Sequence, residues 1–130
     1  MIAGIGVDIV DVSRVEKLLS RYGDRFLRRV FTDAEVKYAT GAANHAERLA
    51  GRFAVKEAFL KALGTGKSQG ILWRDVETVG GPMGRPVVRL HGQAVRWMRY
   101  RGGNTVHVSI AHDGGKAVAF LILEKGGGAE

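Results

Sequence analysis

Apolar and polar positions alternate along residues 2–10, and this alternation predicts a β-strand. One face of the strand carries three β-branched residues, Ile5, Val7 and Ile9. The other face carries two glycines and an acid, Gly4, Gly6 and Asp8. Because the run is apolar and β-branched, we expect the strand to be buried. The glycines leave room on their face for a ligand or for a second stretch of backbone beside the Asp8 carboxylate.

Capping boxes, in which a polar cap precedes an acid by three residues, predict three helix starts after this strand. The pairs are Ser13 with Glu16, Thr32 with Glu35, and Asn44 with Glu47. The predicted helices cover residues 13–22, 32–41 and 44–63, with a short helical piece carrying Phe26, Leu27 and Val30 after Gly23. The third helix has the strongest pattern, because Leu49, Phe53, Leu60 and Leu63 form a core stripe and Gly64 provides a C-terminal stop.

The second half of the chain predicts mainly strands. Two short strands, residues 76–79 and 87–90, flank a hairpin-like turn over residues 80–86, and a helix covers residues 93–101. Two longer strands, residues 105–112 and 117–124, are joined by a hairpin turn over residues 113–116. The order β-ααα-ββ-α-ββ predicts one α+β domain over residues 1–125. Residues 126–130 are glycine-rich and predict a flexible tail.

The composition narrows the class of protein. The chain has 130 residues, of which 45% are hydrophobic and 25% are charged, as is typical of one globular domain. It contains no cysteine, no apolar run of ~18 residues and no signal-peptide pattern at its start. These absences exclude a disulfide scaffold, a thiolate metal site and a transmembrane helix. We therefore expect a cytoplasmic protein.

The charge indicates the kind of partner. Twenty lysines and arginines against thirteen acids give a net charge of +7. Such a balance favours nucleic acid, a nucleotide or an acidic protein surface. Basic residues concentrate between Ser13 and Phe31, and residues 78–112 contain no acid. Any one of these arginines also fits a solvated basic face that has no partner.

Three familiar motifs are incomplete. Residues 64–68 are similar to the end of a phosphate-binding P-loop, but Lys61 stands where the first glycine is needed and the loop follows a helix. Residues 4–9 lack the third glycine of a dinucleotide fingerprint. His107 and His112 lie five residues apart on a predicted strand, so they point to opposite faces and do not chelate one metal ion.

Three polar residues stand in places where the pattern does not require them: Asp8 in an apolar strand, Glu57 in the longest helix, and His107 opposite Val106, Val108 and Ile110. Each has a simple structural explanation as well. Glu57 fits a surface pair with Lys61, Asp8 fits a cap on the next turn, and His107 fits a solvated strand position. Together they suit one chemistry, because two carboxylates can hold Mg²⁺ while water and phosphate oxygens complete its shell.

Three segments carry a resemblance to a known family: residues 4–10 (Gly-Ile-Gly-Val-Asp-Ile-Val), residues 50–66 (Ala-Gly-Arg-Phe-Ala-Val-Lys-Glu-Ala-Phe-Leu-Lys-Ala-Leu-Gly-Thr-Gly) and residues 107–113 (His-Val-Ser-Ile-Ala-His-Asp). They resemble holo-[acyl-carrier-protein] synthase, the small bacterial single-domain type of 4′-phosphopantetheinyl transferase. The similarity covers nearly the whole chain, and three motifs in the right order make it specific. It implies that family's α+β fold, with a mostly antiparallel sheet packed on a long central helix.

The family transfers 4′-phosphopantetheine from coenzyme A to a serine of apo-acyl carrier protein in fatty acid biosynthesis, and it releases adenosine 3′,5′-bisphosphate. The resemblance implies that Asp8 and Glu57 are Mg²⁺ ligands and that Lys61 stabilises the pyrophosphate. Further residues implied in coenzyme A binding are Arg52, Gly64, Pro86 and His107. The serine proton has two implied acceptors, Glu57 or a metal-held water that Glu57 orients.

The resemblance also assigns the basic first helix to a partner. In the family this helix docks the acidic helix of the carrier protein, and the implied docking residues are Arg14, Arg21, Arg25 and Arg28. A homotrimer with active sites between subunits is implied too, and it agrees with the small core of such a chain. Residues 41–48 depart from the family pattern, because they are shorter and less basic. His45 and Arg48 are the candidates here for binding the coenzyme A 3′-phosphate.

Two alternatives stay open at this point. The same transfer also suits a carrier from polyketide or peptide assembly, and one sequence does not separate these carriers. A small basic nucleic-acid-binding module fits the charge and the acid-free stretch, but only Trp73, Trp97 and Tyr100 are available nearby to stack on bases. We expect an enzyme whose partners are coenzyme A and a carrier protein, with neither a nucleic acid nor a membrane.

Overall fold

The computed structural model describes residues 1–126 and confirms an α+β fold. Its helices are α1 (Val12–Tyr22), α2 (Asp24–Val30), α3 (Asp33–Thr40), α4 (His45–Leu63) and α5 (Gly92–Tyr100). Its strands are β1 (Ile2–Asp11), β2 (Val76–Gly80), β3 (Pro86–Leu90), β4 (Thr105–Asp113) and β5 (Lys116–Glu124). Short 3₁₀ turns cover Trp73–Asp75 and Pro82–Gly84. The predicted tail over residues 126–130 lies outside the described residues from position 127 onward.

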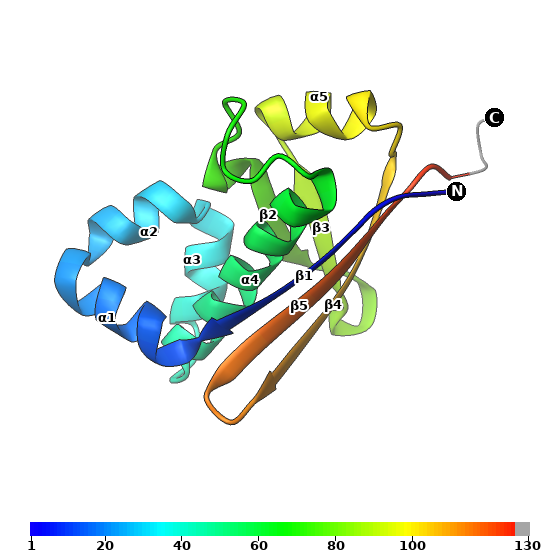
Figure 1. Ribbon diagram of the computed structural model, residues 1–130. Coiled ribbons are helices and arrows are strands. Elements are labelled where there is room, and N and C mark those ends of the chain that lie inside the picture. Colours follow the sequence, from blue (N-terminus) through cyan, green and yellow to red (C-terminus); the bar gives the residue numbers. More distant parts are fainter. Residues whose placement is uncertain (127–130) are drawn as a thin grey trace.

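The long helix α4 lies across a three-stranded antiparallel sheet of order β1-β5-β4, and helices α1 to α3 gather at one end of it (Figure 1). The predicted stripe of Leu49, Phe53, Leu60 and Leu63 is buried. Phe59 and Val55 are buried too, so α4 contributes core residues on most of its circumference. Burial of a large apolar side chain stabilises the fold by about 1.5–3 kcal/mol. This helix is therefore the centre of the core.

The glycine face of β1 packs directly on α4. A Cβ atom at Gly6 would overlap the carbonyl oxygen of Ala58, and one at Gly4 would overlap that of Ala62. The close approach of a second backbone is thus one of the two uses that the sequence suggested for this face. Its consequence is that Asp8, on the same face, lies beside α4.

The prediction that β1 is a buried strand is wrong for its other face. Ile5 is 56% exposed, Val7 is 48% exposed and Ile9 is 60% exposed. Phe120 of the neighbouring strand β5 pairs with Val7 and is 43% exposed. Alternation along a strand shows which residues share a face but not which face is covered. The single chain leaves an apolar sheet face uncovered, and we call these four residues the outer sheet face.

Helix boundaries follow the predicted caps in part. Thr32 and Glu35 form the expected capping box at α3. Gly64 ends α4 with φ of 79°, in the left-handed conformation that glycine adopts at least cost. The prediction of Ser13 as an N-cap is wrong, because α1 begins at Val12 and Asp11 precedes it without a side-chain cap. Asn44 precedes α4 as expected, but its side chain caps no amide.

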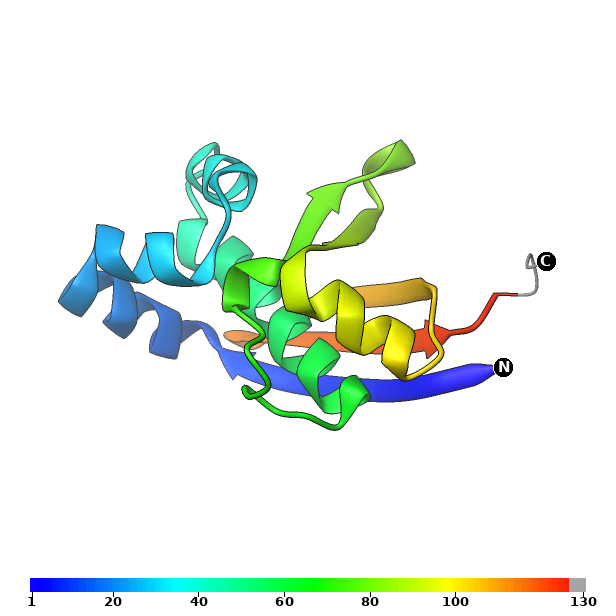
Figure 2. The same ribbon diagram turned by 90° about the horizontal axis from the view of Figure 1, so that it is seen from above.

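The short piece after Gly23 is a helix of its own, α2, so four α-helices rather than the predicted three lie between β1 and β2. Strands β2 and β3 pair only with each other and form a separate antiparallel hairpin. Figure 2 shows this hairpin rising from the helix layer on the side away from β1. The hairpin is therefore free to form one wall of a groove beside α4.

A buried ion pair joins α4 to α3 and β2. The Lys56 Nζ donates to Glu35 Oε1 at 2.8 Å, to the Trp73 carbonyl at 3.0 Å and to the Val76 carbonyl at 2.6 Å. Neither charged side chain is exposed to solvent. Burial lowers the pKa of Lys56, while the adjacent Glu35 opposes that shift. Sequence patterning shows Glu35 only as a cap and gives no sign of its buried partner.

No helix within residues 1–126 combines the length and the apolar character needed to cross a bilayer.

Candidate active site

Two carboxylates from distant parts of the sequence meet where β1 crosses α4. Asp8 lies on the glycine face of β1, and Glu57 lies on α4 one residue before Ala58, whose carbonyl faces Gly6. The side chain of Asp8 is 11% exposed and that of Glu57 is 24% exposed. The packing of a bare strand face on a helix therefore places the two predicted acids together and partly shields them from water.

Each acid contacts one cation of the chain. The Lys61 Nζ donates to Asp8 Oδ1 at 2.6 Å and to the Val7 carbonyl at 3.3 Å. An Arg14 Nη1 lies 3.6 Å from Glu57 Oε1, and the Arg14 guanidinium also sits 5.0 Å from the ring centre of Phe53. Arg14, which the sequence predicts to dock the carrier, thus also reaches Glu57, one of the two candidate catalytic acids.

Lys61 and Arg14 do not fully offset the repulsion between the two carboxylates. Burial raises the pKa of Glu57, the nearby Asp8 carboxylate raises it further, and Arg14 offsets only part of that shift. Glu57 Oε1 is buried without a hydrogen-bond partner among the described residues. The contact with Asp8 raises the pKa of Lys61, so this lysine stays charged. An added cation at this point would satisfy an orphaned oxygen and separate two like charges.

These donors suit a hard divalent ion. Both are carboxylates, the ligand type that Mg²⁺ prefers, and a protein site for Mg²⁺ commonly supplies one or two of them while water and phosphate oxygens complete the shell. Within residues 1–126 no cluster of three or more potential ligands exists, so the chain offers an open two-ligand site rather than a closed cage. The residues present fit the predicted Mg²⁺.

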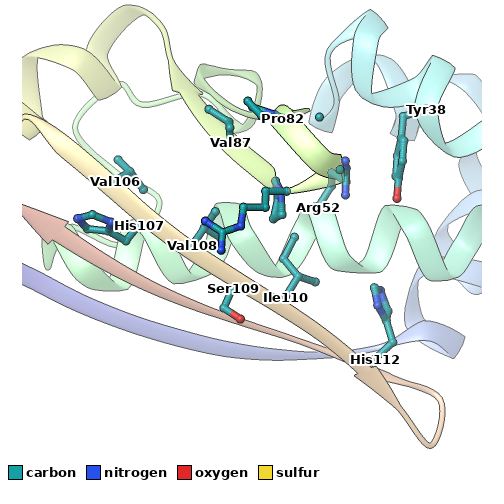
Figure 3. A pocket seen from close by; sticks show the side chains of 14 residues that line it. Tyr38, Arg52, Pro82, Val87, Val106, His107, Val108, Ser109, Ile110 and His112 are labelled. Carbon is teal, nitrogen blue, oxygen red and sulfur yellow. The ribbon is translucent and has the colours of Figure 1, made fainter.

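A groove of about 950 Å³ lies between the β2–β3 hairpin, β4 and α4 (Figure 3). Three of the predicted coenzyme A residues, Arg52, Pro86 and His107, line it. Figure 3 shows Tyr38 and His112 toward one end of the groove and His107 toward the other. A groove of this size suits a ligand of the size of a nucleotide.

Arg52 gives the groove a charged wall. Its side chain belongs to α4 and is 7% exposed, yet its Nε has no hydrogen-bond partner among the described residues. Burial lowers its pKa, and the guanidinium stacks 3.7 Å from the ring centre of Tyr38. Arg48 packs on the same ring at 4.3 Å. A buried arginine without an acid partner is a ready donor for an anionic ligand.

Two histidines of β4 border the groove, and each has a partner. The His107 Nε2 lies 2.7 Å from Glu124 Oε1, and this contact lowers the pKa of Glu124. The His112 Nε2 lies 3.0 Å from the Glu47 carbonyl, and its ring packs where Gly51 carries no side chain. Sequence reasoning did not select Tyr38 or His112 as groove residues, because their approach depends on how α3 and β4 pack around α4.

The remaining predicted residues lie elsewhere. Lys61 and Gly64 do not line the groove, and Gly64 lies beside the Arg101 guanidinium. Asp8 is on β1 and His107 is on β4, which are the two outer strands of the sheet, with β5 between them. The acids and the groove therefore lie at opposite edges of the sheet in one chain. The structure brings Asp8, Glu57 and Lys61 together in one group and Arg52, Pro86 and His107 in another.

The predicted docking arginines belong to two consecutive helices. Arg14 and Arg21 belong to α1, and Arg25 and Arg28 belong to α2. All four are exposed. His45, one candidate for the 3′-phosphate, is exposed at the start of α4, while Arg48, the other, packs on Tyr38 near the groove.

Comparison with known proteins connects these features to a family. The family model described as the 4′-phosphopantetheinyl transferase superfamily matches residues 4–119. The chain belongs to the 4′-phosphopantetheinyl transferase superfamily. It is therefore an enzyme of phosphopantetheinyl transfer rather than a nucleic-acid-binding module.

Relatives within the superfamily match the chain along its length. It is 47% identical to the holo-[acyl-carrier-protein] synthase of Koribacter versatilis, over 95% of this chain and 99% of that protein. Its fold matches the crystal structure of the synthase from Neisseria meningitidis with a TM-score of 0.87 and 33% identity, over 96% of this chain and 100% of that one. The synthase of Helicobacter pylori, solved in complex with coenzyme A, matches with a TM-score of 0.81 and 31% identity, over 92% and 99% of the two chains.

Proposed function

We propose that this transferase moves 4′-phosphopantetheine from coenzyme A to a serine hydroxyl of apo-acyl carrier protein, depends on Mg²⁺, and releases adenosine 3′,5′-bisphosphate. We assign it to fatty acid biosynthesis in the cytoplasm, with residues 1–125 as the transferase domain. One observation carries the proposal: in a chain of this superfamily, Asp8, Glu57 and Lys61 form one charged cluster. The names of the relatives and their coenzyme A complexes support the two substrates.

Asp8 and Glu57 would hold the Mg²⁺, which when bound supplies positive charge against the pyrophosphate of coenzyme A. Lys61 contributes a mobile ammonium that can leave Asp8 and bind a phosphate oxygen, because its side chain is 58% exposed. Glu57, or a water that it orients, accepts the proton of the serine hydroxyl.

The groove at the β4 edge would hold the nucleotide part of coenzyme A. Arg52 supplies a buried guanidinium whose Nε lacks a hydrogen-bond partner among the described residues, Pro86 a rigid apolar contact from the hairpin, and His107 a further donor at the groove's other end. Gly64 would bring backbone close to the pyrophosphate from the end of α4. Coenzyme A bound in this way would present its pyrophosphate toward an acid cluster.

A homotrimer would bring the two groups together. In one chain the acids and the groove lie at opposite edges of the sheet, so the β1 edge of one subunit must meet the β4 edge of the next to form one site. The outer sheet face, formed by Ile5, Val7, Ile9 and Phe120, gives an apolar surface for that assembly. We therefore expect wild-type protein to have three times the 14.1 kDa mass of the chain in light scattering.

The variant Val7→Glu tests this assembly. A carboxylate on the outer sheet face would be buried without a partner in the trimer, so the variant should fall to the monomer mass. Ser20→Glu, which adds the same charge to an exposed position of α1, should keep the wild-type mass. A Val7→Glu protein that retains the wild-type mass would show that this face is not the interface.

The exposed arginines of α1 and α2 would dock the carrier. Arg14, Arg21, Arg25 and Arg28 present a basic surface to an acidic helix, and such charge pairs mainly raise the association rate and weaken with salt. The apo-acyl carrier protein of fatty acid synthesis is the proposed partner. Carriers of polyketide or peptide assembly would compete through the same chemistry, and values of kcat/KM measured side by side would rank them.

Mass spectrometry of the carrier tests the proposed reaction. After incubation with coenzyme A and Mg²⁺, the apo-carrier should gain the mass of one phosphopantetheine group. Asp8→Asn should abolish this gain, because a metal ligand is lost while the shape is kept. Glu16→Gln, which neutralises an exposed acid on α1, should leave it in place. A carrier that stays unmodified with wild-type enzyme, across several carriers, would refute the proposal.

A further inference from the structure

The two cations at the acid cluster differ from the acids in how freely they can move. The Arg14 side chain is 54% exposed and that of Lys61 is 58% exposed, whereas the carboxylates they contact are 24% and 11% exposed. The acids are thus fixed by the packing of β1 on α4, and the cations cover them from the solvent side. Two positively charged side chains contact the two carboxylates. Together they carry the same charge as one divalent ion.

Arg14 has a second feature that Lys61 lacks. It lies on α1, among the exposed arginines that the proposed function assigns to the carrier, and its guanidinium rests 5.0 Å from the ring centre of Phe53. Its distance of 3.6 Å from Glu57 Oε1 is that of a loose ion pair rather than a hydrogen bond. A small movement would turn this side chain from Glu57 toward an acidic surface that approaches α1.

We propose that Arg14 and Lys61 are internal counter-ions that compete with the divalent metal, and that an acidic carrier draws Arg14 away from Glu57, so that carrier docking tightens metal binding. The inference rests on the proposed function, because it takes Asp8 and Glu57 as metal ligands and α1 as the carrier surface. It adds a link, through Arg14, between the metal site and the carrier-docking surface of α1. Arg14 acts through Glu57 and is a positioning residue at the metal site.

The coupling must act in both directions. If docking of the carrier raises the affinity for the metal by some factor, the metal raises the affinity for the carrier by the same factor. Loose ion pairs at exposed positions have modest energies, so we expect a factor of about two to five. Enzyme that already holds the metal would then bind the carrier more tightly, and enzyme that already holds the carrier would bind the metal more tightly.

Binding of Mn²⁺, measured from the electron paramagnetic resonance signal of the free ion, tests the inference without any turnover. The samples contain the enzyme without coenzyme A, either alone or with saturating apo-acyl carrier protein whose acceptor serine is replaced by alanine. In wild-type enzyme the carrier should lower the Kd for Mn²⁺ by about two- to fivefold. Arg14→Met should bind Mn²⁺ more tightly than wild type without the carrier, and the carrier should change its Kd little.

Lys17→Met is the matched control. It removes the same charge from the same helix, but Lys17 is exposed and makes no ion pair with either acid among the described residues. It should keep the effect of the carrier on the Kd for Mn²⁺. An effect of the carrier that is equal in wild type and Arg14→Met would overturn the inference, as would weaker Mn²⁺ binding by Arg14→Met alone.

The Asp8→Asn variant separates this inference from the proposed function. If wild type binds Mn²⁺ and Asp8→Asn does not, the metal site stands and only the Arg14 results decide the coupling. If Asp8→Asn binds Mn²⁺ as tightly as wild type, the proposed metal site itself is wrong and the inference fails with it.

Discussion

Single residues decide how close β1 lies to α4. Gly6 has no room for a side chain, because a Cβ would overlap the Ala58 carbonyl. The same contact sets the position of Asp8, two residues along the strand, against Glu57. A methyl group at position 6 would therefore disturb both the stability of the fold and the spacing of the two acids.

We predict that Gly6→Ala lowers the free energy of unfolding by about 1–3 kcal/mol, the usual cost of an overfilled core contact. The variant should also lose affinity for Mn²⁺, since its acids move apart. Gly80→Ala is the control, because a Cβ at Gly80 meets no atom within 4 Å and should change neither property. Urea unfolding and Mn²⁺ titration measure the two effects, and a Gly6→Ala protein as stable as Gly80→Ala would contradict the account.

Glu57 gives a prediction about pH. Burial and Asp8 raise its pKa in the folded protein, so between the unfolded and the folded pKa the folded state binds more protons. Metal-free wild type should therefore lose stability as pH rises through that window. In EDTA at neutral pH, Glu57→Gln should have a higher Tm than wild type, because it removes one of two like charges.

Added Mg²⁺ should reverse this order, since the ion stabilises the form that binds it. It should raise the Tm of wild type and leave that of Glu57→Gln unchanged. Glu16→Gln, at an exposed position of α1, serves as the control and should follow wild type in both conditions. Thermal melts at several pH values measure the effect, and a Glu57→Gln protein that is less stable than wild type in EDTA would disprove this explanation.

At the scale of elements, a buried ion pair holds α4 in its orientation. Lys56 donates hydrogen bonds to Glu35 of α3, to the Trp73 carbonyl before β2 and to the Val76 carbonyl at the start of β2. It directly precedes Glu57 in the sequence. The apolar contacts of α4 lie all around it, so they do little to define its rotation. The buried ion pair provides directional contacts on one side of the helix.

We predict that Lys56→Met lowers the free energy of unfolding by about 3–5 kcal/mol, because Glu35 is then buried without its partner. Lys56→Met combined with Glu35→Gln should lose less than Lys56→Met alone, since no charge remains unpaired. Urea unfolding of both proteins makes the comparison. A double variant that is no more stable than the single one would show that the charge of Glu35 is not what destabilises Lys56→Met.

The elements that could be predicted from sequence are those whose signals are local. The end of α4 at Gly64 and the capping box of Thr32 and Glu35 depend on residues a few positions apart, and both were predictable. The start of α1 was not, because Ser13 offers a cap that the chain does not use. The pairing of Lys56 with Glu35 joins residues that only tertiary packing brings together, so no pattern indicates it.

At the scale of the whole molecule, the grouping of the site residues was not predictable in full. The pattern singled out Asp8, Glu57 and His107, and the strand pattern placed Asp8 beside two glycines. The resemblance added Arg52 and implied the role of each residue. Neither showed that the acids lie at one edge of the sheet and the groove at the other. The exposure of Ile5, Val7 and Ile9 was not predictable either, because alternation shows which residues share a face but not whether that face is covered.

In the proposed trimer, each site would combine the acids of one copy of the chain with the groove of the next. A single chain would then be inactive, because it would lack half of a complete site. A substitution in the acids or in the groove would inactivate only the sites to which that half contributes. This property distinguishes a shared site from one built within each subunit.

Mixing two impaired variants tests this claim most directly. Asp8→Ala disables the acid edge, and His107→Glu sets a second acid beside Glu124 at the groove edge, where it would repel coenzyme A phosphates. When the two proteins are unfolded together and refolded as mixed trimers, about one quarter of the sites should combine two intact edges. Carrier modification should then recover to about one quarter of the wild-type rate. A mixture that works no faster than the average of the two variants measured separately would contradict the account.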